Sequence, residues 1–71
     1  MQNSLKEVRM TKGITQVAMA RKLNITSRMY QYLESGHCEP RISQVYKMSQ
    51  ILDTPVEILF PPLIDYSKEA R

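Results

Sequence analysis

The sequence is short of several features on which other protein classes depend. Its 71 residues include one cysteine, Cys38, and no tryptophan. A single cysteine excludes an internal disulfide, which fits a reducing compartment. No apolar run approaches the roughly 18 residues that a membrane span requires, and residues 1–10 hold no apolar segment typical of a signal peptide. We therefore expect a cytoplasmic protein that makes no contact with a membrane.

Glycine and proline are also scarce, with two and four residues, and they form no low-complexity segment. No internal repeat is visible, and no stretch is typical of a strand. A chain of this length forms one domain, and a core of this size rarely supplies more than roughly 3–5 kcal/mol alone. We therefore expect a compact helical domain, and dimerisation is one way to stabilise it further.

Acidic residues are outnumbered by basic ones, and the imbalance is uneven along the chain. Residues 1–47 carry eight lysines and arginines against three glutamates, whereas residues 48–71 carry two basic and four acidic residues. The net charge of +3 therefore arises from the first part of the sequence. A basic surface suits a polyanion such as nucleic acid, although a solvated surface that leans positive would have the same composition.

Apolar residues recur at helical spacing in five segments, so the predicted fold is all-α. Four hydroxyl residues are the predicted N-caps: Ser4, Thr15, Thr26 and Thr54. Glutamates three residues after the first and last of these complete capping boxes. Asn24 and Gly36 follow the second and third segments, and both residue types readily take the left-handed conformation that ends a helix. The predicted helices span residues 4–12, 15–23, 27–35, 43–52 and 54–60.

A pair of prolines ends regular helix after the last of these segments. We expect residues 1–60 to form the domain and residues 61–71 to form a C-terminal tail. The tail is apolar enough to pack on a partner subunit through Leu63, Ile64 and Tyr66.

The predicted helix 27–35 has two contrasting faces. At 100° per residue, Tyr30 and Leu33 point inward, while the opposite face carries a hydroxyl, a guanidinium, a carboxamide and a phenol. These groups can read base edges, because Arg can bond guanine, Gln can bond adenine, Ser can donate or accept, and a ring can contact a thymine methyl. An ordinary exposed helix with mixed polar residues is the alternative. The outward residues are Ser27, Arg28, Gln31 and Tyr32.

The spacing of residues 16–35 favours the first interpretation. A small residue, Ala20, lies at the fifth position, where two helices can approach closely, and a turn residue, Asn24, lies at the ninth. Apolar residues stand at the positions that fill the wedge between two crossing helices: Met19, Leu23, Ile25, Tyr30 and Leu33. This is the pattern of a helix-turn-helix, in which the second helix is the recognition helix.

These residues resemble the phage-repressor helix-turn-helix proteins, the Cro/C1-type or Xre family. The resemblance covers residues 4–60, and its most specific features are Thr-Gln at 15–16, Glu-Ser-Gly at 34–36, and Arg9 upstream. It implies five helices, binding to double-stranded DNA as a homodimer through the major groove, and transcriptional regulation as a repressor at a near-palindromic operator.

The resemblance also assigns roles by position. Gln16 matches a residue that contacts phosphate and braces the recognition helix, and Arg41 matches a contact to the DNA backbone. Arg9 and Glu34 match a partly buried ion pair between the first and third helices. Apart from the resemblance, His37 is placed to touch phosphate near the end of the recognition helix. The positions that meet base edges and nearby backbone are Thr26, Ser27, Arg28 and Tyr32, with Gln31 beside them.

Two residues depart from the family pattern. Asn24 replaces the usual turn glycine, and the conformation required there is accessible to asparagine. Tyr30 stands where Ile or Val is usual. A buried phenol must find a hydrogen-bond partner or reach solvent, so we expect the third helix to be displaced slightly.

The adjacent His37 and Cys38 suggest a metal site or a nucleophile, but they cannot form either. The chain has no other histidine or cysteine to complete a zinc site, and a cysteine nucleophile requires a histidine that is separate in sequence. We expect no catalytic residue, no metal, no cofactor and no small-molecule ligand. The alternative function is a protein-interaction module, such as an antitoxin or an anti-repressor partner, with the tail as its working surface.

Overall fold

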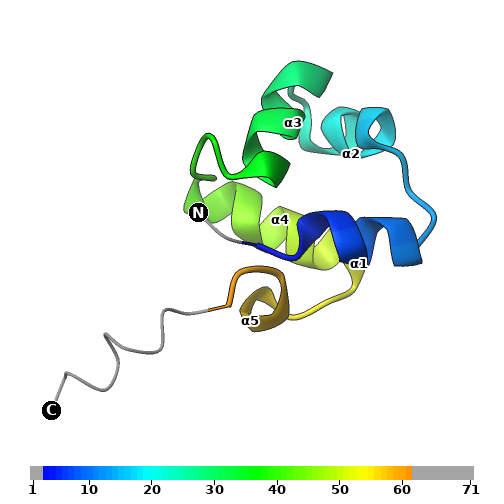
Figure 1. The fold of residues 1–71 in the computed structure, drawn as a ribbon, viewed down its shortest axis with the longest axis vertical. Helices are drawn as coiled ribbons and strands as arrows, with labels where there is room; N and C mark the ends of the chain where they lie inside the picture. The colour runs from blue at the N-terminus through cyan, green and yellow to red at the C-terminus, as the bar shows by residue number, and fades with distance from the viewer. Residues whose placement is uncertain (1–2, 62–71) are drawn as a thin grey trace, which may run out of the picture.

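The computed structural model describes residues 3–61, and all regular structure within that range is helical (Figure 1). The prediction of an all-α fold with five helices is confirmed. The tail residues Leu63, Ile64 and Tyr66, to which a role in dimerisation was assigned, lie outside the described residues. The helices are α1 Leu5–Thr11, α2 Gln16–Leu23, α3 Ser27–Ser35, α4 Ile42–Leu52 and α5 Val56–Leu59.

The helices surround one core to which each of them contributes. In Figure 1, α2 and α3 lie together on one side, α1 and α4 lie in the middle, and α5 lies on the far side. The Ser4 N–H donates to the Leu59 carbonyl at 2.8 Å and so ties α5 to the start of α1. Within residues 3–61, no helix has both the length and the hydropathy to cross a membrane. The core cluster consists of Leu5, Met19, Ala20, Leu23, Tyr30, Met48, Leu52 and Leu59.

The helix-turn-helix has the caps and terminators that the sequence predicts. The Thr15 hydroxyl accepts the Ala18 N–H at 3.0 Å, and the Thr26 hydroxyl accepts the N–H three residues later at 3.1 Å. Asn24 and Gly36 end α2 and α3 with φ values of 60° and 87°. Because these angles are left-handed, each helix stops abruptly and the chain changes direction within one residue.

The turn between α2 and α3 is fixed by close packing. Ala20 is only 2% exposed and its carbonyl accepts the Ile25 N–H at 3.0 Å. A larger side chain at position 20 would hold the two helices apart, so the small residue sets their separation. Ile25 packs against the core from the turn itself. The third helix, α3, is therefore held by the turn as well as by its own buried residues.

Two of the predicted caps are wrong. The Ser4 side chain makes no capping bond, and the Asn3 carboxamide oxygen instead accepts the Leu5 N–H at 3.0 Å. Thr54 donates its hydroxyl to the Leu52 carbonyl at 2.8 Å, so it closes the preceding turn and does not cap α5. Asn3 thus serves the first N–H of α1, and the Thr54 hydroxyl is used in the turn before α5. Neither capping box forms.

Replacing Thr15 with alanine tests the cap of α2. We expect the free energy of unfolding to fall by about 1 kcal/mol, because the Ala18 N–H loses its acceptor. For a domain of this size, Tm should fall by about 4–8 °C. Thr11→Ala is the matched control, since its exposed hydroxyl bonds only the Glu7 carbonyl within α1. Equal losses in the two variants would show that the cap contributes nothing specific.

Candidate nucleic-acid interface

The outward face of α3 carries the polar groups that the sequence places there. Arg28 and Gln31 are exposed, Ser27 is half-buried, and Tyr32 is 37% exposed. The hydroxyl oxygen of Thr26 is used as the cap of α3, so this residue positions the helix whatever else it contacts. On the opposite face, Tyr30 and Leu33 are buried, as predicted.

Two shallow hollows bring these residues beside others that the sequence did not single out. One hollow lies at the turn between α2 and α3, and Arg21 joins Thr26 and Ser27 in its lining. The other lies where α1, α2 and α3 meet, and Lys6 joins Gln16 and Gln31 there. The only sequence signal for Lys6 and Arg21 is their positive charge. Residues 1–47 hold eight basic residues, so charge alone does not single these two out.

Arg41 and His37 lie in the connection between α3 and α4. Arg41 is exposed at the N-cap of α4, where its backbone N–H donates to the Gln44 side chain at 2.8 Å. His37 stacks on Tyr32 with ring centroids 5.7 Å apart. The loop after α3 therefore places one guanidinium and one imidazole next to that helix.

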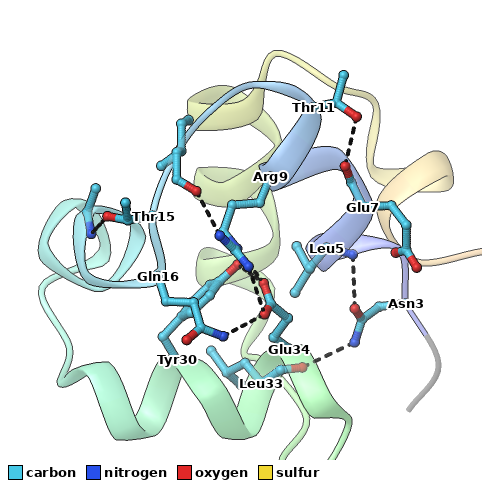
Figure 2. A network of polar contacts seen from close by, with 12 residues as sticks. Asn3, Leu5, Glu7, Arg9, Thr11, Thr15, Gln16, Tyr30, Leu33 and Glu34 are labelled. Atoms are coloured by element: carbon cyan, nitrogen blue, oxygen red, sulfur yellow. Dashed lines mark hydrogen bonds and ion pairs between the residues drawn. The ribbon is translucent and has the colours of Figure 1, made fainter.

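Beneath this face, the Glu34 carboxylate collects bonds from three helices (Figure 2). From α1, the Arg9 Nε lies 2.7 Å from Oε2, and the Arg9 Nη2 lies 3.4 Å from Oε1. From α2, the Gln16 amide donates to Oε1 at 2.7 Å, and within α3 the Tyr30 hydroxyl donates to Oε2 at 2.9 Å. Arg9 is only 8% exposed, and its Nη1 also donates to the Ile14 carbonyl at 2.8 Å.

This buried network explains how α3 accommodates a tyrosine at position 30. The phenol is fully buried, and its hydroxyl finds Glu34 one turn along the same helix. Gln16 braces α3 by the same means, because its amide N–H donates to Glu34. Its phosphate contact stays a prediction. In Figure 2, Arg9 reaches the carboxylate from above and Gln16 reaches it from the left.

The network shifts the titration of all three ionisable groups. Burial favours the neutral form of Glu34, but the hydrogen bonds from Arg9, Gln16 and Tyr30 outweigh it, so the pKa of the Glu34 carboxyl lies below its ordinary value. The bond to Glu34 raises the pKa of the Arg9 guanidinium further. Burial, together with the neighbouring carboxylate, raises the pKa of the Tyr30 phenol. At neutral pH the network therefore contains a carboxylate, a guanidinium and a neutral phenol.

The lowered pKa of Glu34 predicts a loss of stability in acid. The unfolded chain binds a proton at Glu34 near the ordinary glutamate pKa of about 4.3, at a pH where the folded chain still resists protonation. The stabilisation from the ionised carboxylate is thus complete above that pH and is lost as pH falls through the lower folded pKa.

Urea unfolding between pH 2.5 and 7 measures this dependence. We plot the free energy of unfolding against pH and expect its fall in acid to be steeper for wild type than for Glu34→Gln, because the glutamine side chain binds no proton. Glu39→Gln is the control, because it removes an exposed glutamate that takes no part in the network. Equally steep falls in wild type and Glu34→Gln would contradict the prediction.

Within the part of the chain that the structure describes, no cluster of three or more His, Cys, Asp or Glu side chains could hold a metal ion. Cys38 is half-buried in the loop after α3, and no group of that kind includes it. The polar groups gathered around α3 are suited to hydrogen bonding and to charge pairing with a large polar surface.

Comparison with known proteins agrees with this geometry. Residues 5–59 match the helix-turn-helix family, a range that runs from the start of α1 to the end of α5. A relative from Archaeoglobus fulgidus, named as an uncharacterized HTH-type transcriptional regulator, is 28% identical over 60 residues, which are 84% of this chain and 86% of that protein. The chain belongs to the helix-turn-helix family of Cro/C1 or Xre type.

Proposed function

We propose that this protein is a sequence-specific transcriptional repressor that binds a near-palindromic operator as a homodimer, with α3 in the major groove. Family membership gives the general function, which is DNA binding in the regulation of transcription. The observation that carries the finer proposal is the exposed polar face of α3, held in place by a buried network from three helices.

The chemistry of that face supports reading of base edges. An arginine can bond guanine with two hydrogen bonds, a glutamine can bond adenine, and a serine can donate or accept. Arg28, Gln31 and Ser27 provide these groups on one helix. Thr26 stands at the N-terminus of α3, where free N–H groups suit a phosphate. Backbone contacts are assigned to Gln16, His37 and Arg41, with Lys6 and Arg21 as further basic groups beside the face.

A dimer is proposed because one recognition helix covers only a few base pairs. Two copies related by a two-fold axis would place their recognition helices about 34–36 Å apart, on successive turns of one side of the duplex. Bound there, a small domain acts by excluding other proteins from the DNA, which favours repression. Residues 1–60 are proposed as the DNA-binding domain and residues 61–71 as a contact between subunits. The cytoplasm is the proposed location, where DNA and a reduced Cys38 coexist.

A second candidate function is a protein-interaction module, such as an antitoxin. It is favoured by two large apolar side chains one turn apart on α4, since Ile42 is 72% exposed and Tyr46 is 61% exposed. Exposed apolar residues close together often mark protein contacts. Alanine at both positions should abolish such a partner complex and leave operator binding intact if the two functions are separate.

Selection of binding sites from random duplex DNA with the purified protein tests the main proposal. We expect enrichment of a near-palindrome whose half-site centres lie one helical turn apart, about 10 base pairs. Enrichment of a single unpaired half-site would contradict the homodimer. Failure to enrich any sequence at low salt would contradict sequence-specific DNA binding and leave protein contact as the working function.

Arg41→Ala tests a contact that carries no base information. Loss of one phosphate contact per subunit should weaken binding to all operator variants by a similar factor. It should reduce the slope of log K against log salt by about 0.9 per subunit, or about 1.8 for the dimer. Lys12→Ala is the control, because it removes an exposed charge from the end of α1 without touching the proposed interface. A change in the ranking of operator variants would show that Arg41 reads bases.

A further inference from the structure

Three planar side chains form a continuous row on the exposed side of the recognition helix and its following loop. Arg28 Nη1 lies 3.5 Å from the Tyr32 hydroxyl oxygen, at the far end of the phenol ring. His37 stacks on that ring with centroids 5.7 Å apart and an angle of 29° between the planes. Tyr32 thus lies between a guanidinium and an imidazole.

The backbone fixes His37 in this position. Gly36 has a φ of 87°, which reverses the chain after α3 and brings the next residue back toward the helix. The His37 N–H then donates to the Tyr32 carbonyl at 2.9 Å, and the Cys38 N–H donates to the same oxygen at 3.2 Å. The Ser35 hydroxyl donates to that carbonyl and lies 3.5 Å from His37 Nδ1.

The stack matters because an exposed tyrosine on a helix is otherwise free to change rotamer. A side chain that must be ordered on binding lowers affinity, and one that is already ordered does not. His37 stacks on the Tyr32 ring, and Tyr32 as a whole residue remains 37% exposed. The exposed part of Tyr32 is thus an ordered aromatic surface beside the Arg28 guanidinium. Such a pair can contact an apolar group on the DNA and, next to it, a hydrogen-bond acceptor.

In the major groove this combination corresponds to thymine beside guanine. The 5-methyl group of thymine is the apolar group exposed there, and guanine is the base that arginine bonds through two hydrogen bonds. Arg28 and Tyr32 are four residues apart, which is about 6 Å along the helix, or about two base-pair steps of duplex. Arg28 directs one of its N–H groups to Tyr32 and keeps the others for the base.

We propose that Arg28, Tyr32 and His37 act as one preorganised unit that reads a guanine and, within two base pairs of it, the methyl group of a thymine. Arg28 bonds the guanine, Tyr32 contacts the methyl group, and His37 is a positioning residue that holds the Tyr32 ring. This rests on the proposed function, since it concerns the operator that α3 binds. It assigns His37 a role that does not require a phosphate contact.

The test replaces thymine by deoxyuridine in both half-sites of the selected operator, which removes only the methyl groups. Burying one methyl group changes binding about fourfold, so wild type should bind the substituted operator about fifteenfold more weakly. Tyr32→Ala should bind the two operators equally. His37→Ala should fold normally and should bind the thymine operator less than about fivefold more tightly than the deoxyuridine operator. Cys38→Ala, which leaves the stack intact, should match wild type.

His37→Phe separates positioning from phosphate contact. Phenylalanine can stack on Tyr32 but cannot bond a phosphate, so it should restore the discrimination that His37→Ala loses, whatever its overall affinity. Equal discrimination by His37→Phe and His37→Ala would overturn the role of the stack. Tolerance of deoxyuridine at every thymine by wild type would overturn the reading unit alone. Failure to select any DNA would overturn the proposed function together with it.

Discussion

Replacing Glu34 with alanine is expected to lower the free energy of unfolding by about 3–5 kcal/mol, the typical loss when one partner of a buried ion pair is removed. The Glu34 side chain is 6% exposed, and it accepts bonds from Arg9, Gln16 and Tyr30. Alanine would leave a buried guanidinium and a buried phenol without their acceptor. Since a core of this size supplies roughly the same energy in total, the variant should be largely unfolded at 25 °C.

Urea unfolding followed by circular dichroism measures the effect, with every variant in the same concentration of TMAO, an osmolyte that stabilises the folded state. Glu39→Ala is the control for loss of an exposed glutamate. The double variant Arg9→Ala/Glu34→Ala should lose far less free energy of unfolding than the sum of the losses in the two single variants. The reason is that the second substitution removes the charge that the first one left unpaired. If Glu34→Ala lost no more stability than Glu39→Ala, the network would not hold the domain together. Strict additivity of the two losses would show that Arg9 and Glu34 act independently.

Much of the fold follows from local sequence signals. Met19, Ala20 and Leu23 fall on one helical face and are buried, and Asn24 and Gly36 end their helices with positive φ. The errors at Ser4 and Thr54 differ in kind. At α1, the Asn3 carboxamide oxygen accepts the first N–H of the helix, and the Ser4 side chain makes no capping bond. At α5, the Thr54 hydroxyl donates to the Leu52 carbonyl, and no side chain caps the helix. The sequence shows which side chains could cap a helix but not which partner the backbone brings within reach.

The parts of the site that depend on helical periodicity were predictable from the sequence. The parts that depend on side chains from different helices meeting at one point were less so. The outward face of α3 follows from 100° per residue. The meeting of Gln16 and Tyr30 on one carboxylate does not, because it requires the crossing geometry of α2 and α3. The stack of His37 on Tyr32 likewise depends on the chain reversal at Gly36, which a helical pattern does not describe.

Replacing Arg28 with alanine is expected to weaken binding to the selected operator by about 1–3 kcal/mol for each half-site, roughly 5- to 150-fold per half-site, and to relax the preference at one base pair of each. The physical reason is the loss of two hydrogen bonds to one base edge. Arg28 is exposed on α3 and makes one long bond, to Tyr32, so its removal should leave the fold intact. Binding to unrelated DNA should weaken much less.

Titration of the operator and of its single-base variants measures the effect. Arg28→Lys is the matched variant, because lysine keeps the charge but cannot form the two parallel bonds of a guanidinium. It should keep the positive charge at this position while leaving the base preference as relaxed as in Arg28→Ala. This pattern differs from that of Arg41→Ala, in which affinity falls for all variants alike. If Arg28→Ala ranked the operator variants as wild type does, Arg28 would contact only the backbone, and base reading would belong to Ser27, Gln31 and Tyr32.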